Sequence, residues 1–162
     1  IAQCLVGSEM CIRDSCHSGL ADLLDVEAST APAVIAAIQQ QARESGVKTV
    51  FSSHNFAETP PTETMVNTLT DMVRRGADIA KLAVMPQSRT DVLELLAATA
   101  EMADHHPETP VITMSMGALG AVSRLAGETF GSAMTFANPG QASAPGQVSL
   151  DSVNEVLDAL HL

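Results

Sequence analysis

Short apolar runs alternate with longer amphipathic segments along most of this chain. From Leu20 onward, a run rich in Val, Ile and Leu is followed by a polar turn and then by apolar residues at helical spacing, and this unit occurs five times. The runs are continuous rather than alternating, which is typical of parallel strands that are buried on both faces. The pattern therefore predicts an α/β fold in which helices cover a parallel sheet.

The repeating unit gives approximate bounds for each element. Strands are predicted at residues 20–28, 48–56, 78–86, 110–117 and 132–137. Helices are predicted at residues 32–45, 62–75, 90–103, 121–131 and 149–162. We expect Ser29 or Thr30 to cap the first helix. Five units fit an open doubly wound sheet and a (β/α)8 barrel equally well, because the alternation does not say how the sheet closes.

Composition and charge narrow the class of protein. The chain has 162 residues, of which 46% are hydrophobic, with four Phe and no Tyr or Trp, so its core must be aliphatic and rich in Met. A formal net charge of −11 argues against nucleic acid and anionic membrane surfaces as partners. No apolar run reaches the roughly 18 residues that a membrane span needs, and no export signal opens the chain, so we expect a cytoplasmic protein.

Two polar side chains fall inside or at the end of successive predicted strands. Lys81 lies within the apolar run 78–86, where a buried ammonium is costly unless it is paired or its pKa falls. Two interpretations stay open: a lysine that extends to solvent from a strand edge, or an amine kept neutral by an apolar wall so that it can attack a carbonyl. His54, which ends the run 48–56, is a capping residue or a proton-transfer group. Active sites gather at the carboxyl ends of parallel strands in both candidate folds.

Further polar groups follow the fourth and fifth predicted strands. Arg124 comes after the fourth strand, and by itself such an arginine is more often a surface residue. The Gly/Pro-containing loop QASAPGQ, residues 141–147, follows the fifth strand and offers the hydroxyl of Ser143 and the amide of Gln147. Four successive strands thus each present a polar group at the same end of the sheet.

Four motifs in this order give the chain a family resemblance: SSHNF at 52–56, GADIAKLAVMP at 76–86, ITMSMGALGAVSRLAGETFGSAMTF at 112–136 and ASAPGQ at 142–147. From about Ser18 to its end, the chain resembles type I 3-dehydroquinate dehydratase, the (β/α)8 enzyme of the shikimate pathway. The resemblance implies an incomplete TIM barrel in which five βα units correspond to strands four to eight. It also implies that the first three strands, with a Glu-x-Arg substrate clamp and a further Arg and Glu near the histidine, lie upstream.

The resemblance implies a covalent reaction centred on Lys81. This lysine corresponds to the family's Schiff-base residue, which adds to the C3 ketone of 3-dehydroquinate. His54 corresponds to the histidine that removes the C2 proton and then protonates the departing C1 hydroxyl, giving 3-dehydroshikimate. Asp25, in the acidic strand end DVE, is expected to support His54. A histidine suits both proton transfers because its unperturbed pKa is about 6.5.

The remaining implied roles concern substrate binding. Arg124 corresponds to the arginine that holds the substrate carboxylate, and Ser143 and Gln147 correspond to residues that bind substrate hydroxyls. The small-molecule substrate 3-dehydroquinate is the implied partner, and homodimers occur in the family. No metal or cofactor is implied, because the iminium supplies the electron withdrawal.

Two other functions stay open at this point. A different lysine Schiff-base barrel enzyme, such as an aldolase, would share Lys81 but would not call for Arg124, Ser143 and Gln147 together. A non-catalytic protein that kept the scaffold is the third possibility, and the retained lysine and histidine argue against it.

The first residues do not fit the repeating pattern. The stretch LVGSEMCIRDS, residues 5–15, has neither strand nor helix periodicity, and it matches the translation of a transposase adapter used in sequencing libraries. We interpret residues 1–15 as adapter read-through, residues 1–17 as an artefactual or disordered tail, and residues 18–162 as the C-terminal part of the barrel. Of the three cysteines, Cys4 and Cys11 then carry no information about redox compartment, which leaves Cys16 alone, at the junction with the barrel. An unclosed barrel leaves strand edges bare, so we expect this chain by itself to be inactive and prone to aggregate.

Overall fold

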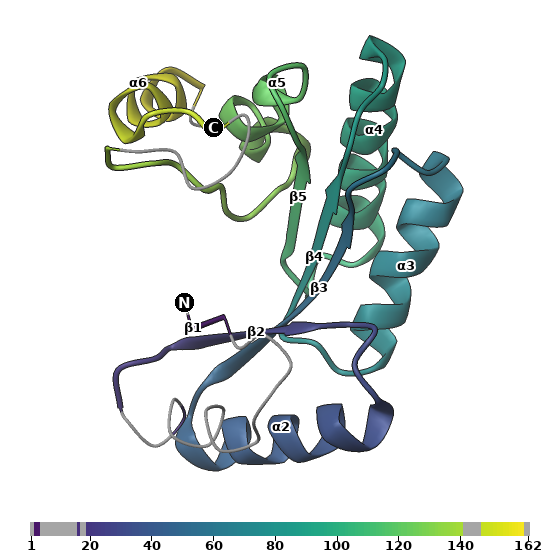
Figure 1. Cartoon of the computed structure of the whole chain (residues 1–162), viewed down its shortest axis with the longest axis vertical. Helices are drawn as coiled ribbons and strands as arrows, with labels where there is room; N and C mark the ends of the chain where they lie inside the picture. Colours follow the sequence, from purple (N-terminus) through teal and green to yellow (C-terminus); the bar gives the residue numbers. More distant parts are fainter. Residues whose placement is uncertain (1, 4–15, 17–18, 141–146, 161–162) are drawn as a thin grey trace.

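A computed structural model describes residues 2–3, 16, 19–140 and 147–160 of the chain (Figure 1). The strands of the sheet are β1 (Ala2–Gln3), β2 (Leu23–Glu27), β3 (Lys48–Asn55), β4 (Ile79–Val84) and β5 (Val111–Ser115). The helices are α2 (Pro32–Ser45), α3 (Thr62–Arg74), α4 (Arg89–His105), α5 (Ala121–Leu125), the 3-10 helix η1 (Glu128–Phe130) and α6 (Leu150–Leu160). Neighbouring strands pair in parallel in the order β1-β2-β3-β4-β5, which confirms the predicted α/β class with a parallel sheet.

The main hydrophobic core lies between the sheet and helices α2, α3 and α4, which cover its outer face (Figure 1). Phe51 of β3 and Leu24 of β2 are fully buried there, together with Met65 of α3 and Met102 of α4. Because successive side chains of a strand point to opposite faces, these residues fix which strand positions point outward. The aliphatic, Met-rich core predicted from composition is confirmed.

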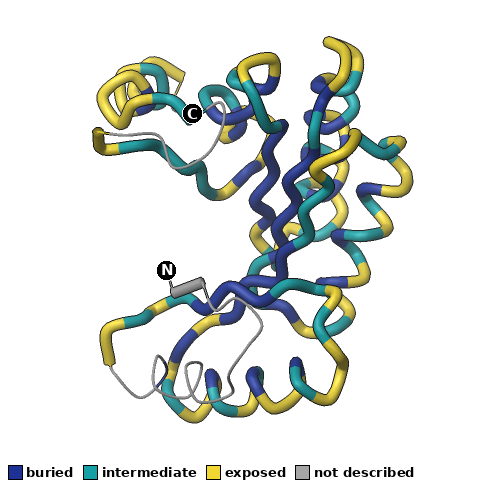
Figure 2. The backbone as a smooth tube through the Cα atoms, in the orientation of Figure 1, coloured by how far each residue is buried: buried dark blue, intermediate teal, exposed yellow. Residues whose placement is uncertain are grey.

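A second, smaller cluster lies on the inner face of the sheet. It contains three buried residues, Ala83, Ile112 and Met114. Partly buried hydrophobic residues packed against it are Ile79, Met116, Met134 and Phe136. Figure 2 shows the strands buried along most of their length and curved around a concave side of the molecule. The inner face thus carries the side chains that alternate with those of the main core.

The start of α2 differs from its predicted cap. Its N-cap is Ala31, which makes no side-chain capping bond, and Pro32 occupies the first turn. The prediction of Ser29 or Thr30 is therefore wrong. The amide of Thr30 donates to the carbonyl of Glu27 in a turn that directly follows β2, so the chain is still turning at these residues. Proline suits the first helical position because its fixed φ matches the helix and that position lacks an amide partner in any case.

The predicted fifth strand at residues 132–137 is also wrong as a strand. The structure has one isolated bridge there, Val111 to Ser132, with the amide of Ala133 donating to the carbonyl of Val111 at 2.8 Å. The Oγ of Ser132 accepts the Thr113 amide at 3.2 Å, so a side chain takes the place of a backbone acceptor and the ladder does not continue. The predicted helix at 121–131 is divided into α5 and η1.

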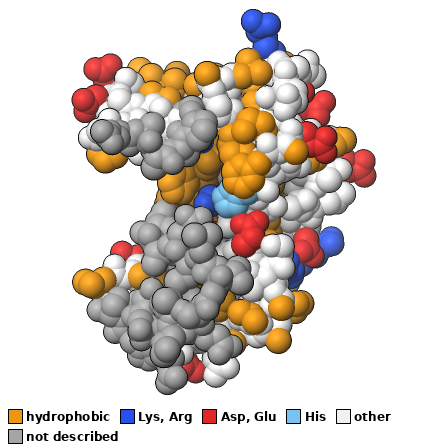
Figure 3. Space-filling view, in the orientation of Figure 1, with side chains coloured by type: hydrophobic (Ala, Val, Ile, Leu, Met, Phe, Trp, Pro, Cys, Tyr) orange, Lys and Arg blue, Asp and Glu red, His pale blue; other side chains and the backbone are white. Residues whose placement is uncertain are grey.

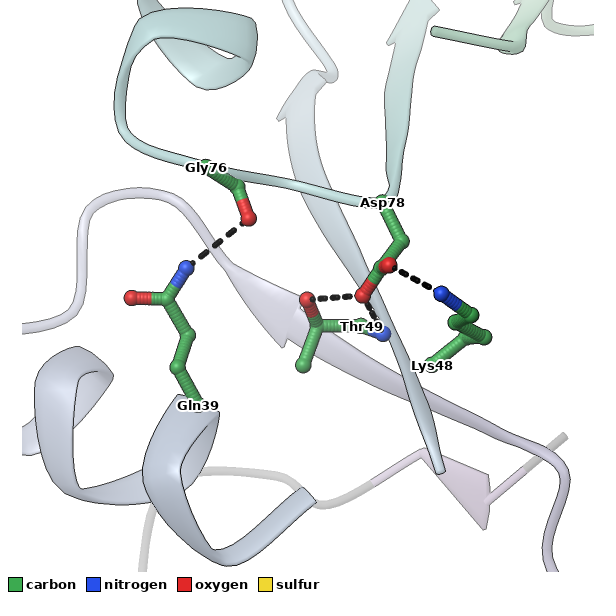
Figure 4. Close-up of polar contacts among 5 residues, drawn as sticks. All are labelled: Gln39, Lys48, Thr49, Gly76 and Asp78. Carbon is green, nitrogen blue, oxygen red and sulfur yellow. Dashed lines mark hydrogen bonds and ion pairs between the residues drawn. The ribbon is translucent and has the colours of Figure 1, made fainter. Parts of the chain in front are cut away.

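A polar clamp joins the amino ends of β3 and β4 (Figure 4). One oxygen of Asp78 accepts from Lys48 Nζ at 2.8 Å. The other oxygen accepts from the amide and the hydroxyl of Thr49, at 2.8 and 3.0 Å. Nearby, Gln39 of α2 donates to the carbonyl of Gly76 at 2.9 Å, which ties α2 to the turn before β4. These bonds fix the register at the end of the sheet opposite to His54.

Most of the predicted tail at residues 1–17 lies outside the described residues. Within it, Ala2–Gln3 pairs in parallel with Leu24 and Asp25, and Cys16 is buried in the main core. In the part of the chain that the structure describes, no helix is long and apolar enough to cross a membrane.

Candidate active site

Lys81 and His54 lie on the same face of the sheet. In the register between β3 and β4, Lys81 is opposite Ser52 and His54 is opposite Ala83. His54 therefore aligns two residues beyond Lys81, which gives both side chains the same direction. Their strand neighbours Phe51, Ala80 and Leu82 point into the outer core instead. The two predicted catalytic groups thus share the concave inner face.

Lys81 is buried and has a carboxylate partner. Its Nζ lies 2.6 Å from Oδ2 of Asp25, and the two side chains are only 8% and 4% exposed. The ring of Phe136 lies under the amine, with 5.2 Å between Nζ and the ring centroid. Neither interpretation of Lys81 from the sequence is correct as stated: the amine does not extend to solvent, and its wall is not purely apolar. The ion pair compensates the desolvation that burial imposes on each charge.

His54 is held by Glu27 rather than by Asp25. Its Nδ1 lies 2.9 Å from Oε2 of Glu27, and the same oxygen is 3.4 Å from the hydroxyl of Ser52. The ring of Phe56 stacks on the imidazole, with 5.8 Å between centroids and 9° between planes. The prediction that Asp25 supports His54 is therefore wrong, because Asp25 is paired with Lys81.

The sheet register explains how the two carboxylates are assigned. Asp25 and Glu27 are two residues apart on β2, so both point to the inner face. Glu27 is opposite Ser52, which in turn is opposite Lys81. Glu27, Ser52 and Lys81 are thus level with one another across the three strands. The Lys81 side chain extends toward the amino end of β2 and contacts Asp25, and the Glu27 side chain extends toward the carboxyl end of β3 and contacts His54. The sequence motif DVE indicated an acidic strand end, and strand alternation could have identified Glu27 as a second inward carboxylate.

Arg124 is buried on α5 beside a cavity. It is 4% exposed, and its Nε has no hydrogen-bond partner among the described residues. Burial lowers the pKa of the Arg124 guanidinium from its ordinary value, although an arginine stays charged at any physiological pH. The cavity, of about 230 Å³, is lined by Arg124, Thr135 and Met134 among others. Since Met134 also packs in the inner-face cluster, the cavity adjoins the face that carries Lys81.

The position of α5 depends on close contact with the end of β5. The hydroxyl of Ser123 accepts the Ser115 amide at 2.9 Å and donates to the carbonyl of Gly120 at 2.7 Å. A Cβ at Gly120 would lie 2.2 Å from the carbonyl oxygen of Ser115. Only glycine permits the backbone at 120 to lie this close to Ser115. Because Arg124 follows Gly120 by one helical turn, this contact places Arg124 near the carboxyl end of the sheet.

Of the two substrate-binding residues predicted in the loop 141–147, the structure describes only Gln147. Ser143 lies outside the described residues. Gln147 is half-buried, and its backbone oxygen accepts from Nδ2 of Asn138 at 3.5 Å. The roles of both residues in substrate binding remain predictions.

Figure 3 shows the concave side as a hollow in the molecular surface. A histidine, a basic side chain and an acidic side chain meet at its floor, with hydrophobic side chains around them. Strand β4 thus bears an amine that can form an imine, β3 bears an imidazole that can move a proton, and α5 bears an arginine that can bind an anion.

Comparison with known proteins places this geometry in a family. A sequence model described as "Type I 3-dehydroquinase" matches residues 9–162. The chain belongs to the type I 3-dehydroquinase family. Among curated members, the 3-dehydroquinate dehydratase of Klebsiella pneumoniae is 49% identical over 148 residues, which make up 91% of this chain and 59% of that protein. The chain therefore spans about three fifths of the length of the curated relatives it matches.

Solved structures of the family agree with the fold. The type I 3-dehydroquinate dehydratase of Clostridium difficile superposes with a TM-score of 0.88 at 44% identity, covering 94% of this chain and 59% of that one. The 3-dehydroquinate dehydratase of Geobacillus kaustophilus gives a TM-score of 0.88 at 45% identity, covering 96% of this chain and 62% of that one. The α/β fold with its parallel sheet is that of the type I family.

Proposed function

We propose that this chain forms an incomplete (β/α)8 barrel, the C-terminal part of a longer protein. In this proposal the whole protein dehydrates 3-dehydroquinate to 3-dehydroshikimate. The proposal makes it a hydro-lyase of the shikimate pathway, acting through a Schiff base on Lys81. The observation that carries it is the presence of a buried amine and a carboxylate-held imidazole on one concave face of a family member. The Klebsiella pneumoniae relative, 49% identical over 148 residues, bears the name of this enzyme.

In the proposed reaction, Lys81 forms the covalent bond. Its Nζ loses a proton and adds to the C3 ketone, and the resulting carbinolamine loses water to give an iminium. The iminium draws electrons from the neighbouring carbon, so the C2 proton becomes acidic and His54 removes it. The enamine then expels the C1 hydroxyl, which leaves as water after His54 returns the proton. Hydrolysis of the imine releases the product and restores Lys81.

Arg124, Ser143 and Gln147 orient the substrate in this proposal. A guanidinium binds a carboxylate through two parallel hydrogen bonds, which fixes both the position and the rotation of the ring. The buried Arg124 Nε, which has no hydrogen-bond partner among the described residues, supports an anion at this place. Ser143 and Gln147 would bind the ring hydroxyls from the loop that precedes α6.

A covalent mode of binding has a parallel among the relatives. The structure of the Clostridium difficile enzyme is described as holding "Covalent Modified Comenic Acid". The proposed partner of this chain remains the small molecule 3-dehydroquinate, and a homodimer belongs to the proposal for the whole protein.

Borohydride trapping tests the proposed function. The experiment uses a completed chain, in which the N-terminal segment of the Klebsiella pneumoniae relative that this chain does not match precedes residue 18. With 3-dehydroquinate and borohydride, Lys81 should gain the mass of the reduced ligand, and turnover should be lost in step with this labelling. The Lys81→Ala variant should neither be labelled nor turn over.

Lys48 provides the matched control, because it is the other lysine of the chain and its side chain is 67% exposed. Lys48→Ala should be labelled and active like the unchanged protein. Turnover without an adduct on Lys81, or an adduct confined to Lys48, would contradict the proposal. An aldol substrate trapped in place of 3-dehydroquinate would instead identify an aldolase.

A further inference from the structure

We propose that Asp25 and Glu27 are positioning residues with separate tasks: Asp25 serves the bond-forming step at Lys81, and Glu27 serves the proton transfers at His54. The inference rests on the proposed function and extends it to two carboxylates of one strand. Each carboxylate contacts one of the two catalytic groups within 3 Å, at 2.6 Å and 2.9 Å.

Asp25 is placed to accept the proton that Lys81 must lose. An amine attacks a ketone only through its lone pair, so a proton has to leave Nζ first. Oδ2 of Asp25 lies 2.6 Å from Nζ, and both groups are shielded from water. The proton passes to Asp25, the nitrogen lone pair forms the bond to carbon, and the carbonyl oxygen becomes the hydroxyl that leaves as water after taking up a proton.

The second oxygen of Asp25 supports an active role. Oδ1 is buried and has no hydrogen-bond partner among the described residues. A buried carboxylate oxygen without a hydrogen bond is costly, so a donor that reaches Oδ1 would be bound favourably. Oδ1 is therefore available to a group that enters the inner face with the substrate, such as the departing water.

Glu27 fixes which nitrogen of His54 reacts. A carboxylate can only accept a hydrogen bond, so the 2.9 Å contact assigns the proton to Nδ1 and leaves the lone pair on Nε2. Parallel stacking on Phe56 restricts tilting of the ring. Nε2 is consequently the atom that takes the C2 proton and returns it to the hydroxyl. Glu27 itself touches neither substrate atom in this scheme.

The two tasks predict different effects on the labelling rate and on the isotope effect in the completed chain. Asp25→Asn should slow both turnover and borohydride labelling of Lys81 by about 100-fold, because imine formation becomes limiting. Glu27→Gln should slow turnover by about 100-fold while the labelling rate stays within about twofold, because only proton transfer is impaired. With substrate deuterated at C2, the isotope effect on kcat should grow in Glu27→Gln and vanish in Asp25→Asn.

One control variant and two variants that change only the length of a carboxylate side chain accompany these substitutions. Asp22→Asn removes an exposed carboxylate just before β2 and should leave both rates unchanged. If Asp25→Asn does not fold, Asp25→Glu keeps the charge while moving the oxygen, and it should show the same joint loss of labelling and turnover. Glu27→Asp should likewise slow turnover and not labelling.

The outcomes separate this inference from the proposed function. If the unchanged completed chain forms no adduct at Lys81, the proposed function fails. If the adduct forms but the folded Asp25 and Glu27 variants lose labelling and turnover equally, with unchanged isotope effects, the division of tasks is overturned and the carboxylates are structural supports. An Asp25→Asn variant that labels at the normal rate overturns it as well.

Discussion

Arg124 combines a permanent charge with an almost fully buried side chain. An anionic ligand would supply the partner that Nε lacks among the described residues. A lysine at this place would keep the charge but lose the planar pair of donors that matches a carboxylate.

We therefore expect Arg124→Lys to raise KM for 3-dehydroquinate by about 10-fold to 100-fold in the completed chain. The expected loss corresponds to one hydrogen bond between charged groups, about 1.5–3 kcal/mol. Steady-state kinetics measure the effect, and an unchanged melting temperature shows that the fold is intact. A KM equal to that of the unchanged chain would exclude Arg124 from substrate binding.

At the level of single residues, positions in or at the end of apolar runs were enough to nominate Lys81 and His54, whereas Arg124 was nominated by the family resemblance. The sequence was not enough to pair the carboxylates. Alternation shows that Asp25 and Glu27 share a face, but which cation each one meets depends on the stagger between strands. That stagger is set by tertiary contacts such as the Asp78 clamp, which involves residues 29 or more positions apart in the chain.

The Asp78 clamp makes the amino end of the sheet sensitive to acid. Burial by itself would raise the pKa of Asp78, but the hydrogen bonds from Lys48 and Thr49 outweigh it and leave the pKa below its ordinary value of 3.8. A carboxyl whose pKa is lowered by folding contributes stability above its ordinary pKa, and this contribution disappears as the pH falls through the folded-state pKa.

Asp78→Asn should therefore lower the free energy of unfolding at neutral pH by about 1 kcal/mol, a value reduced for partial exposure. The difference between variant and parent should shrink as the pH falls below the ordinary value of 3.8 and disappear below the folded-state pKa. Urea unfolding of the completed chain at several pH values measures it. Asp71→Asn, which removes an exposed i,i+4 pair with Arg75, is the control and should cost less than about 0.5 kcal/mol. A difference that persists unchanged in acid would contradict this account.

Gly120 sets the distance between α5 and β5. An alanine there would place its Cβ against the backbone of Ser115, which cannot move away as a flexible side chain could. We expect Gly120→Ala to destabilise the completed chain by about 1–3 kcal/mol and also to raise KM, because Arg124 follows on α5.

Thermal unfolding and kinetics together test this expectation. The matched control is Gly140→Ala, since nothing lies within 4 Å of a Cβ at that position. It should leave both quantities unchanged. If Gly120→Ala matches the control, α5 is not held by this contact.

The elements themselves were predicted well where local signals were strong. The helix at 32–45 was found at its observed bounds, because Pro32 opens it and Gly46, with φ of 71°, closes it. The strand predicted at 132–137 was wrong, because nothing in its apolar run indicates that the Ser132 hydroxyl accepts the Thr113 amide in place of a backbone carbonyl. Local sequence reports propensity, whereas ladder formation depends on the neighbouring strand.

On the scale of the whole molecule, the described residues bury the centre of the inner-face cluster, while other apolar side chains stay at the surface. Side chains with large apolar surface, including Phe56 at 70% exposure and Val122 at 47%, lie exposed. The α/β class and the family could be predicted from the alternating pattern and the motifs. How the sheet closes could not, because five units are compatible with more than one architecture.

We expect the 162-residue chain by itself to aggregate and to lack dehydratase activity, while the completed chain stays monodisperse and active. Unpaired strand edges and exposed apolar side chains favour association between copies. Light scattering, size-exclusion chromatography and binding of a hydrophobic dye compare the two. If the 162-residue chain by itself is monodisperse and turns over 3-dehydroquinate fully, the expectation is contradicted.

The order of the strands in space is their order along the backbone, and this has a genetic consequence. Each βα unit pairs chiefly with the units beside it in the gene, so a cut between two units severs one connection and divides only the strand pair at that point. Two polypeptides encoded by separate reading frames, one ending and the other beginning at such a cut, should recognise each other through the strand edges they leave bare. Co-expression of this chain with the N-terminal segment of a relative that it does not match, about two fifths of that protein, would then restore growth to a bacterium that lacks dehydroquinate dehydratase.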